Sequence, residues 1–279
     1  MISAKIVCDS LHPEPAFKSR LTTFVLTYPR FIHAEFMTHR VFSRNASSSR
    51  AIPVMKQIEM IERDPAIPLA FRKNQKGMQA GDILENNDEI VQLWLDARDE
   101  CVSIAKRMAQ MDVHKQYANR ILEPWAHITV VVTATEWANF FALRIHTAAM
   151  PEICELAMQM YRCYQDSQPQ QLHYVDWHVP FVTALEKESL QQLDTLRMSV
   201  ARCARVSYMK HDGTPSTLEE DEALCLRLIN NDPIHASPFE HQATPVPYNE
   251  FIGNLRGWRQ YRKTFTNENV TTYTGGGVP

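Results

Sequence analysis

Several common signatures are missing from this 279-residue sequence, and each absence removes a class of protein. The six cysteines form no Cys-x-x-Cys pair and show no zinc-ligand spacing, which argues against a zinc module and a dithiol redox centre. No apolar run reaches the length that crosses a bilayer, and the first residues lack a secretory signal. We therefore expect free thiols, no membrane partner and a cytoplasmic location in the producing or host cell.

An excess of positive charge is also missing. The formal net charge is −3, from 29 basic and 32 acidic residues, so no overall positive field attracts nucleic acid, and a nucleic-acid partner is disfavoured. A pocket for a nucleotide-sized anion needs only local charge and stays possible. Apolar residues make up 44% of the chain, which is ordinary for a globular protein.

Periodic apolar residues predict both strands and helices. Two stretches rich in β-branched residues, 21–28 and 128–133, predict strands, although the second could also begin a helix. Steps of three and four residues predict helices over 88–111, 135–148, 151–164, 190–204 and 217–230. Within the first of these, the apolar series predicts one buried stripe: Ile90, Trp94, Ala97, Cys101, Ala105 and Met108.

The most polar stretch runs from Thr38 to Arg50. It holds one imidazole, three guanidinium groups, five hydroxyls and an amide within thirteen residues. No hydrophobic period passes through 43–50, so we expect a loop there rather than a core element. Arginine forks with neighbouring hydroxyl donors suit an anionic, oxygen-rich ligand such as phosphate. A solvated loop is the plain alternative.

A second polar stretch, from Asp232 to His241, places two histidines, one serine and one glutamate around Pro238-Phe239. A metal site is weakly indicated because the helical His-Glu-x-x-His spacing is absent, and a serine nucleophile lacks its Gly-x-Ser-x-Gly turn. Two interpretations remain. One is a turn capped by Ser237 with Glu240 bonding back, and the other is a cofactor-binding turn.

Together with a third block, these stretches resemble the flavin-dependent thymidylate synthase family, the thymidylate-synthase-complementing proteins. The family's hallmark loop is matched by His39, Arg40, Ser43, Asn45, Ser48 and Arg50. A helical Asn-Phe-x-x-Leu-Arg pattern is matched by 139–144, followed by Glu152-Ile153, and an upstream Arg-x-x-x-Pro element is matched by 120–124. The family's Ala-Arg-Val-Ser and His-x-Ser-Pro-Phe-Glu-His elements are matched by 204–207 and 235–241.

The order of these blocks differs from the family. Its Ala-Arg-Val-Ser and His-x-Ser-Pro-Phe-Glu-His elements precede the hallmark loop, whereas here they follow everything else. Gln260-Tyr261-Arg262 also looks like a degraded copy of the Arg-His-Arg position, so we interpret 20–50 and 242–270 as a partial duplication. The polar passage at 165–172 predicts a division into two segments, 1–175 and 190–279.

The resemblance implies a fold, a reaction and an assembly. The fold is of the α/β class (α+β type), with an antiparallel twisted sheet flanked by helices. The reaction is reductive methylation of dUMP to dTMP, with FAD as cofactor and with methylene-tetrahydrofolate and NADPH as co-substrates. The family's active sites are shared between subunits, so a homo-oligomer, tetramer or dimer, is expected. The alternatives are a flavin-dependent hydroxymethylase acting on dUMP or dCMP, and a non-catalytic nucleotide- or RNA-binding relative.

The resemblance also assigns roles to residues. Substrate binding falls to Glu35, Ser48, Arg50, Arg120 and Arg144, of which Arg144 faces the uracil ring and acts in catalysis. Contacts to FAD fall to His39, Arg40, Asn139, Ser207, His235 and Ser237, and no metal ligand is expected. A plain structural alternative exists for Arg144, which is an ion pair with Glu152.

Three positions depart from the family pattern. Thr38 stands in place of the first hallmark arginine, Ala46 in place of a glutamate and Glu35 in place of a glutamine. Arg44, which the pattern does not require, is a candidate to replace the charge missing at Thr38. The departures at Thr38 and Ala46 motivate the hydroxymethylase alternative.

Overall fold

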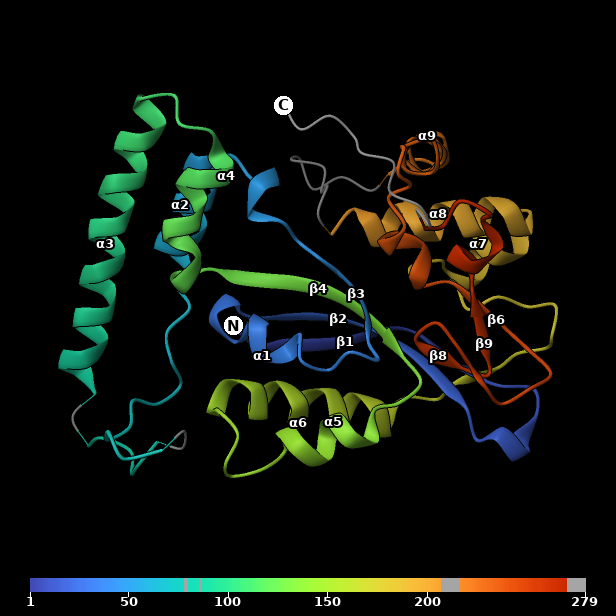
Figure 1. Ribbon diagram of the computed structural model, residues 1–279, viewed down its shortest axis with the longest axis horizontal. Coiled ribbons are helices and arrows are strands. Elements are labelled where there is room, and N and C mark those ends of the chain that lie inside the picture. Colours follow the sequence, from blue (N-terminus) through green and yellow to red (C-terminus); the bar gives the residue numbers. More distant parts are fainter. Residues whose placement is uncertain (78–79, 86, 207–215, 270–279) are drawn as a thin grey trace.

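The computed structural model describes residues 1–77, 80–85, 87–206 and 216–269. Its central element is a five-stranded sheet in the order β3-β4-β2-β1-β5 (Figure 1). The long strands β1 (Ser3–Leu11), β2 (Arg20–Pro29) and β4 (His127–Ala134) pair antiparallel, as does β3 (Ser43–Ala46) with β4. The two-residue β5 (Gln170–Gln171) runs parallel to β1. The predicted antiparallel sheet flanked by helices is confirmed.

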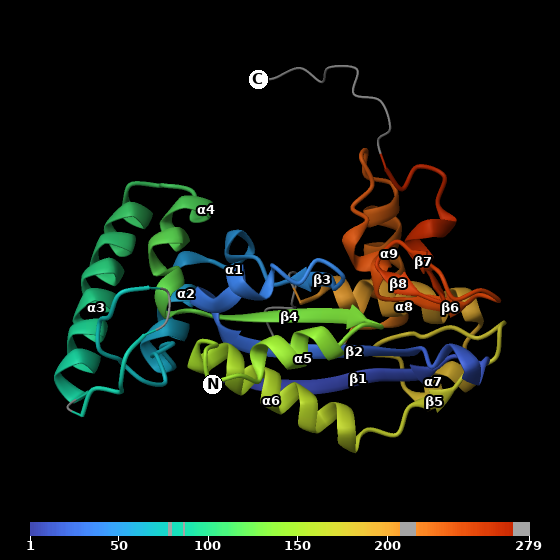
Figure 2. The same ribbon diagram turned by 60° about the horizontal axis from the view of Figure 1, so that its bottom comes forward.

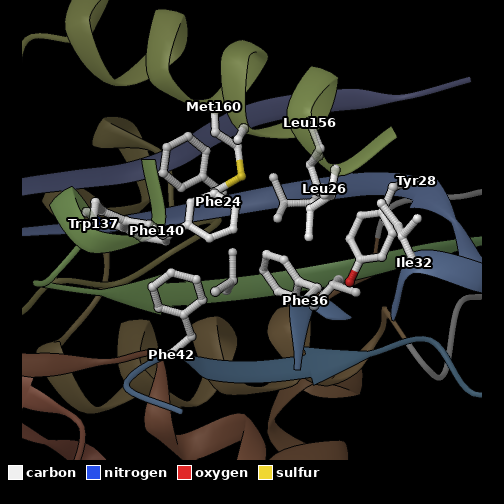
Figure 3. Close-up of a cluster of buried hydrophobic side chains, with 14 of the residues drawn as sticks. Phe24, Leu26, Tyr28, Ile32, Phe36, Phe42, Trp137, Phe140, Leu156 and Met160 are labelled. Carbon is white, nitrogen blue, oxygen red and sulfur yellow. The ribbon is translucent and has the colours of Figure 1, made fainter. Parts of the chain in front are cut away.

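One face of the sheet packs on α5 (Ala138–Arg144) and α6 (Pro151–Asp166) and holds the main core. Alternate residues of β2, namely Phe24, Leu26 and Tyr28, point into this core, because successive side chains of a strand face opposite sides. Figure 3 shows them between the sheet and Met160 and Leu156 of α6. Burying each of these side chains contributes about 1.5–3 kcal/mol, which fixes the helices that carry the site residues.

The C-terminal segment packs on the opposite face of the sheet. It consists of helices followed by short strands: α7 (Ala184–Ser189), α8 (Gln192–Ala204), α9 (Leu218–Ile229), η5 (Ser237–Glu240), β6 (Ala243–Pro245), β7 (Phe251–Ile252), β8 (Leu255–Arg256), β9 (Trp258–Gln260) and η6 (Tyr261–Thr264). A capping box formed by Thr217 and Glu220 begins α9. Asn45 of β3 donates to the Cys203 carbonyl of α8 at 2.7 Å, so this segment directly contacts the hallmark stretch.

A chain of buried hydroxyls and imidazoles, which we call the polar seam, joins the C-terminal segment to the sheet. His178 lies between Ser10 Oγ (2.9 Å) and Thr23 Oγ1 (2.8 Å). Thr23 Oγ1 is 2.7 Å from Thr133 Oγ1, which in turn is 2.8 Å from His241 Nδ1. Both histidines are fully buried, so the seam fastens the segment to the sheet without contact with solvent.

Three helices form a separate wing beyond the end of the sheet (Figures 1 and 2). They are α2 (Val54–Arg63), α3 (Asp88–Gln110) and α4 (Lys115–Ala118), with a small core of their own. The predicted helix at 88–111 is confirmed, but its predicted buried stripe is only partly correct. Ala105 is fully buried, whereas Ala97 is exposed, because α3 packs on its neighbours through a narrow side centred on Val102 and Ala105.

Two further expectations require correction. Residues 43–46 form an edge strand rather than a loop, because Ser43 and Asn45 are buried by contacts with the C-terminal segment. Residues 242–270 do not repeat the ten-residue strand β2; the described part of this stretch forms the short pairs β6–β9 and β7–β8. The division of the chain at 175–190 remains a prediction.

None of the helices among the described residues has the length and apolar character needed to cross a bilayer.

Candidate functional site

Arg144, the last residue of α5, binds the turn that follows α1 (His33–Phe36). Its Nε donates to His39 Nε2 at 2.9 Å and its Nη2 donates to Thr38 Oγ1 at 3.2 Å. Its Nη1 forms a close ion pair with the Glu35 carboxylate. The side chains of Arg144 and Glu35 are 17% and 31% exposed, so a ligand can reach both. We call Glu35, Thr38, His39 and Arg144 the first cluster.

Packing between aromatic rings holds the residues of the first cluster next to one another. The His39 ring lies 4.8 Å from Phe140 and 5.6 Å from Phe42, measured between ring centroids. Phe140 belongs to α5, one turn before Arg144, and also contacts Phe36 of α1. The buried rings thus bring together two segments that lie 105 residues apart in sequence. The alternative partner Glu152 is excluded as the ion-pair partner of Arg144, because its carboxylate is buried and accepts from Leu69 N at 2.6 Å.

His39 is neutral in this arrangement. Burial lowers its pKa to about 4, and the nearby charges of Arg144 and Arg44 act in the same direction. Since Nε2 accepts a hydrogen bond from Arg144, the proton of the neutral ring resides on Nδ1. Arg44 Nη1 donates to the carbonyls of Met37 (2.9 Å) and His39 (3.3 Å), which places its charge beside Thr38.

A second cluster forms around Glu123 of η4 (Asn119–Trp125). Glu123 Oε1 accepts from Ser49 Oγ at 2.9 Å and from Arg120 Nη1 at 3.0 Å, and it forms an ion pair with Arg30 Nη2 at 3.0 Å. Asn119 holds the same turn, since its side chain donates to the Ser49 carbonyl at 2.7 Å. The structure therefore brings the stretch around η3 (Ser49–Ala51) together with Arg120.

Other predicted residues adjoin the second cluster, and one residue was missed. The Ser48 hydroxyl accepts from Arg50 N at 3.3 Å and begins η3, while the Arg50 side chain is exposed. The Arg120 side chain is 55% exposed. Arg30 was not predicted as a site residue. The only sequence signal was a basic residue directly after Pro29, where β2 ends.

The residues predicted to contact FAD lie on both sides of the 39–46 stretch. Arg40 and Asn139 are exposed, and His39 contacts Phe140 beside Asn139. His235 and Ser237 are half-buried at η5, which packs against β3. Ser207 lies outside the described residues.

The capped-turn interpretation of 232–241 is wrong in its details. The N-cap of η5 is Ala236 and not Ser237, and Glu240 pairs with Arg262 instead of bonding back to the turn. The carboxylate thereby connects η5 to η6, because Arg262 belongs to η6. The turn is therefore held by tertiary contacts and not by its own caps. The cofactor-binding interpretation stays a prediction, and the His235 and Ser237 side chains that it needs are half-exposed.

One pocket of the structure lies away from the residues that the sequence predicts for the site. Across the described ranges, no group of three or more His, Cys, Asp and Glu side chains is placed to hold a metal ion. A pocket of about 340 Å³ lies near the chain's first residue and α2, lined by groups such as Thr27, Gln57, Asp64 and His127. The two arginine clusters are surface sites outside this pocket.

The comparison with family models agrees with the motif blocks that lie within residues 7–170. The model of the family described as thymidylate synthase complementing protein matches residues 7–170, more than half of the chain. Solved structures that resemble the chain include the UMP/dUMP methylase PolB from Streptomyces cacaoi bound with 5-Br dUMP. The two share 17% identity over 59% of this chain and 90% of that chain, with a TM-score of 0.48. The same enzyme bound with 5-Br UMP shares 16% identity over 59% and 89% of the two chains, with a TM-score of 0.45. A comparison with curated proteins found no match.

Proposed function

The chain belongs to the thymidylate synthase complementing protein family, and on that premise we propose that it is a flavin-dependent enzyme that modifies a pyrimidine nucleotide. The proposed reaction is reductive methylation of dUMP to dTMP, with FAD as cofactor and with methylene-tetrahydrofolate and NADPH as co-substrates. The observation that carries the proposal is the contact of Arg144 with Glu35, Thr38 and His39. It unites two of the family's motif blocks in one partly exposed cluster.

The two clusters suit the two ends of a nucleotide. We assign Ser48, Arg50 and Arg120 to the phosphate, because guanidinium and hydroxyl donors bind phosphate oxygens with strong, charge-assisted hydrogen bonds. Glu123 already neutralises Arg120, so a phosphate carrying about two negative charges competes with a single carboxylate for the arginine. Arg30, which also contacts Glu123, joins this assignment.

The first cluster suits the base. Arg144 donates only, whereas the ionised Glu35 accepts only, so the pair is complementary to a uracil oxygen next to the N3–H group. A guanidinium at the uracil carbonyl favours the N3 anion, and this anion makes the ring more electron-rich at C5, the carbon that attacks the electrophile. The neutral His39 holds Arg144 in place by accepting from Nε, and Thr38 does the same at Nη2.

The residues assigned to FAD carry donors that suit this cofactor. Arg40 supplies a cation for the pyrophosphate, and Asn139, His235 and Ser237 supply hydrogen-bonding groups for ring carbonyls and ribose. Arg40 and Asn139 are exposed and the other two are half-exposed, so all four are accessible to a ligand. Ser207 remains a predicted contact. When bound, the reduced flavin supplies the hydride of the proposed reaction.

The first experiment is an absorption spectrum of the purified protein. We expect a flavin spectrum, either as purified or after addition of FAD, because the family's chemistry depends on this cofactor. Protein incubated with dUMP, methylene-tetrahydrofolate and NADPH is then expected to yield dTMP, identified by mass. Colourless protein that takes up no FAD contradicts the enzyme proposal and favours a non-catalytic nucleotide- or RNA-binding relative.

Hydroxymethylation of dUMP or dCMP is the second candidate reaction. Two observations favour it: Thr38 and Ala46 depart from the family pattern, and Thr38 belongs to the first cluster. The same incubation separates the two reactions, because a hydroxymethylated nucleotide is heavier than the methylated one. Repeating it with dCMP tests the choice of base. We further propose that the enzyme acts in the cytoplasm as a homo-oligomer with shared active sites.

The phosphate assignment predicts the effect of Arg50→Ala. Loss of one charged hydrogen-bond donor costs about 1.5–3 kcal/mol, so the Kd for dUMP is expected to rise by about 10- to 150-fold. Isothermal titration with dUMP and with deoxyuridine measures this. The nucleoside lacks the phosphate, and its binding should therefore be the same in wild type and variant. The control is Arg227→Ala, an exposed arginine on α9. Equal weakening for both ligands contradicts the assignment.

A further inference from the structure

A row of large apolar side chains on α3 and at its C-cap faces solvent. Leu93 and Ile104 of α3 and the C-cap residue Met111 are 62%, 47% and 78% exposed. The helix lies at the outer edge of the molecule, with α2 and α4 between it and the sheet (Figures 1 and 2). Aligned apolar side chains of this size are uncommon on surfaces that contact only water, and they mark interaction sites.

The spacing of the row is that of a helix-pairing seam. The seam positions follow one another at alternating steps of four and three residues: Leu93, Ala97, Glu100, Ile104, Arg107 and Met111. They are distinct from Val102 and Ala105, through which α3 packs on the wing's own core. The helix therefore has one apolar side used within the chain and a second side without a described partner.

The charged residues of the seam favour a second copy of α3 as the partner and favour an antiparallel orientation of the two helices. The first half of the seam carries Glu100, with Asp96 beside it, and the second half carries Arg107. A second α3 in antiparallel orientation, with its Met111 opposite Leu93, brings its Arg107 next to Asp96 and Glu100. A parallel partner would instead place like charges together. We infer that this seam, Leu93 to Met111, is a two-fold antiparallel interface with a second copy of the chain.

The size of the seam sets the expected strength. A 23-residue helix is about 35 Å long, and one pair of such helices buries less surface than a standard protein interface. Complementary charges at the rim fix the register and orientation more than the affinity. We expect the association step through this seam to have a dissociation constant of about micromolar.

Sedimentation equilibrium of the full chain tests the inference. Leu93→Glu combined with Ile104→Glu is expected to raise the dissociation constant of one association step at least about tenfold. The matched control is Leu185→Glu on α7, a residue that is 74% exposed and outside the seam. Unchanged circular dichroism shows that each variant is folded. The inference is overturned if the wild-type chain is monomeric, or if seam and control variants behave alike.

Charge reversal provides a second test that is independent of the apolar residues. Glu100→Lys and Arg107→Glu are each expected to weaken the association, because each places like charges opposite one another. The double variant restores complementarity and is expected to recover most of the wild-type affinity. Additive weakening in the double variant contradicts the antiparallel arrangement. None of these residues belongs to the arginine clusters, so flavin binding and turnover report separately on the proposed function.

Discussion

We expect Arg144→Ala to lower kcat for dUMP by about 10²–10³-fold while flavin binding stays nearly intact. The guanidinium is the only donor of the first cluster assigned to the uracil ring, and it favours the N3 anion that makes C5 nucleophilic. His39, which is also assigned to FAD, accepts a hydrogen bond from Arg144, but the rings of Phe42 and Phe140 hold His39 as well. Its position therefore does not depend on Arg144 alone. Steady-state kinetics and flavin titration measure the two properties separately.

Two variants control this result. Arg162→Ala removes an exposed arginine from α6 and is expected to leave both kinetics and flavin affinity unchanged. Glu35→Gln keeps a hydrogen-bonding group beside Arg144 but removes its charge. It should reduce kcat less than Arg144→Ala, because His39 and Thr38 still hold the guanidinium. Unchanged turnover in Arg144→Ala refutes the role of this residue.

The polar seam is expected to make the protein sensitive to acid. Burial lowers the pKa of His241 to about 3, and burial also lowers the pKa of His178 well below its usual value, helped by Lys187 and His241. In the unfolded chain both histidines titrate near about 6.5. As the pH falls below that value, the two histidines bind protons in the unfolded state but not in the folded state. The free energy of unfolding therefore decreases.

The size of the effect follows from the pKa difference. At pH 5, His241 alone is expected to cost about 2 kcal/mol relative to pH 7, because one pKa unit corresponds to about 1.4 kcal/mol. His178 acts in the same direction. The loss begins near pH 6.5 and grows until the pH reaches the folded-state pKa of about 3. Urea unfolding at a series of pH values between 7 and 4.5 measures the slope.

Replacing His241 by a residue that does not titrate tests whether the polar seam causes the acid sensitivity. His241→Gln lowers stability at pH 7, because the amide fills the ring's place poorly, but it should flatten the decrease between pH 6.5 and 4.5. His173→Gln, at an exposed position, serves as the control and should keep the wild-type slope. If His241→Gln retains the full slope, another group is responsible for the acid sensitivity.

Much of the fold could be predicted because local patterns determine it. The β-branched run at 128–133 became β4, and the apolar steps over 88–111 became α3. The antiparallel sheet came from the family resemblance, which the family match over 7–170 confirms. The edge strand β3 was missed because Ser43 and Asn45 have no apolar period; distant contacts bury them.

Only part of the candidate site could be predicted, for a related reason. Motifs identified Arg144 and His39, but the ion-pair partner of Arg144 depends on which carboxylate the folded chain places nearby. Glu35, 109 residues away, takes that position, while the sequence neighbour Glu152 points into the core. Arg30 was missed because its contact with Glu123 likewise exists only after folding.

The way β3 is buried also has a consequence for protein synthesis. Asn45 needs the carbonyl of Cys203, 158 residues later, and Ser43 needs Gln260, 217 residues later. While the ribosome makes the chain, the strands β1 to β4 can pair as soon as residue 134 has emerged, but the side-chain partners of Asn45 and Ser43 do not yet exist. The hallmark stretch therefore acquires its final shape only near the end of translation. A chain truncated before residue 260 would present an ordered sheet in which Ser43 lacks its contact with Gln260.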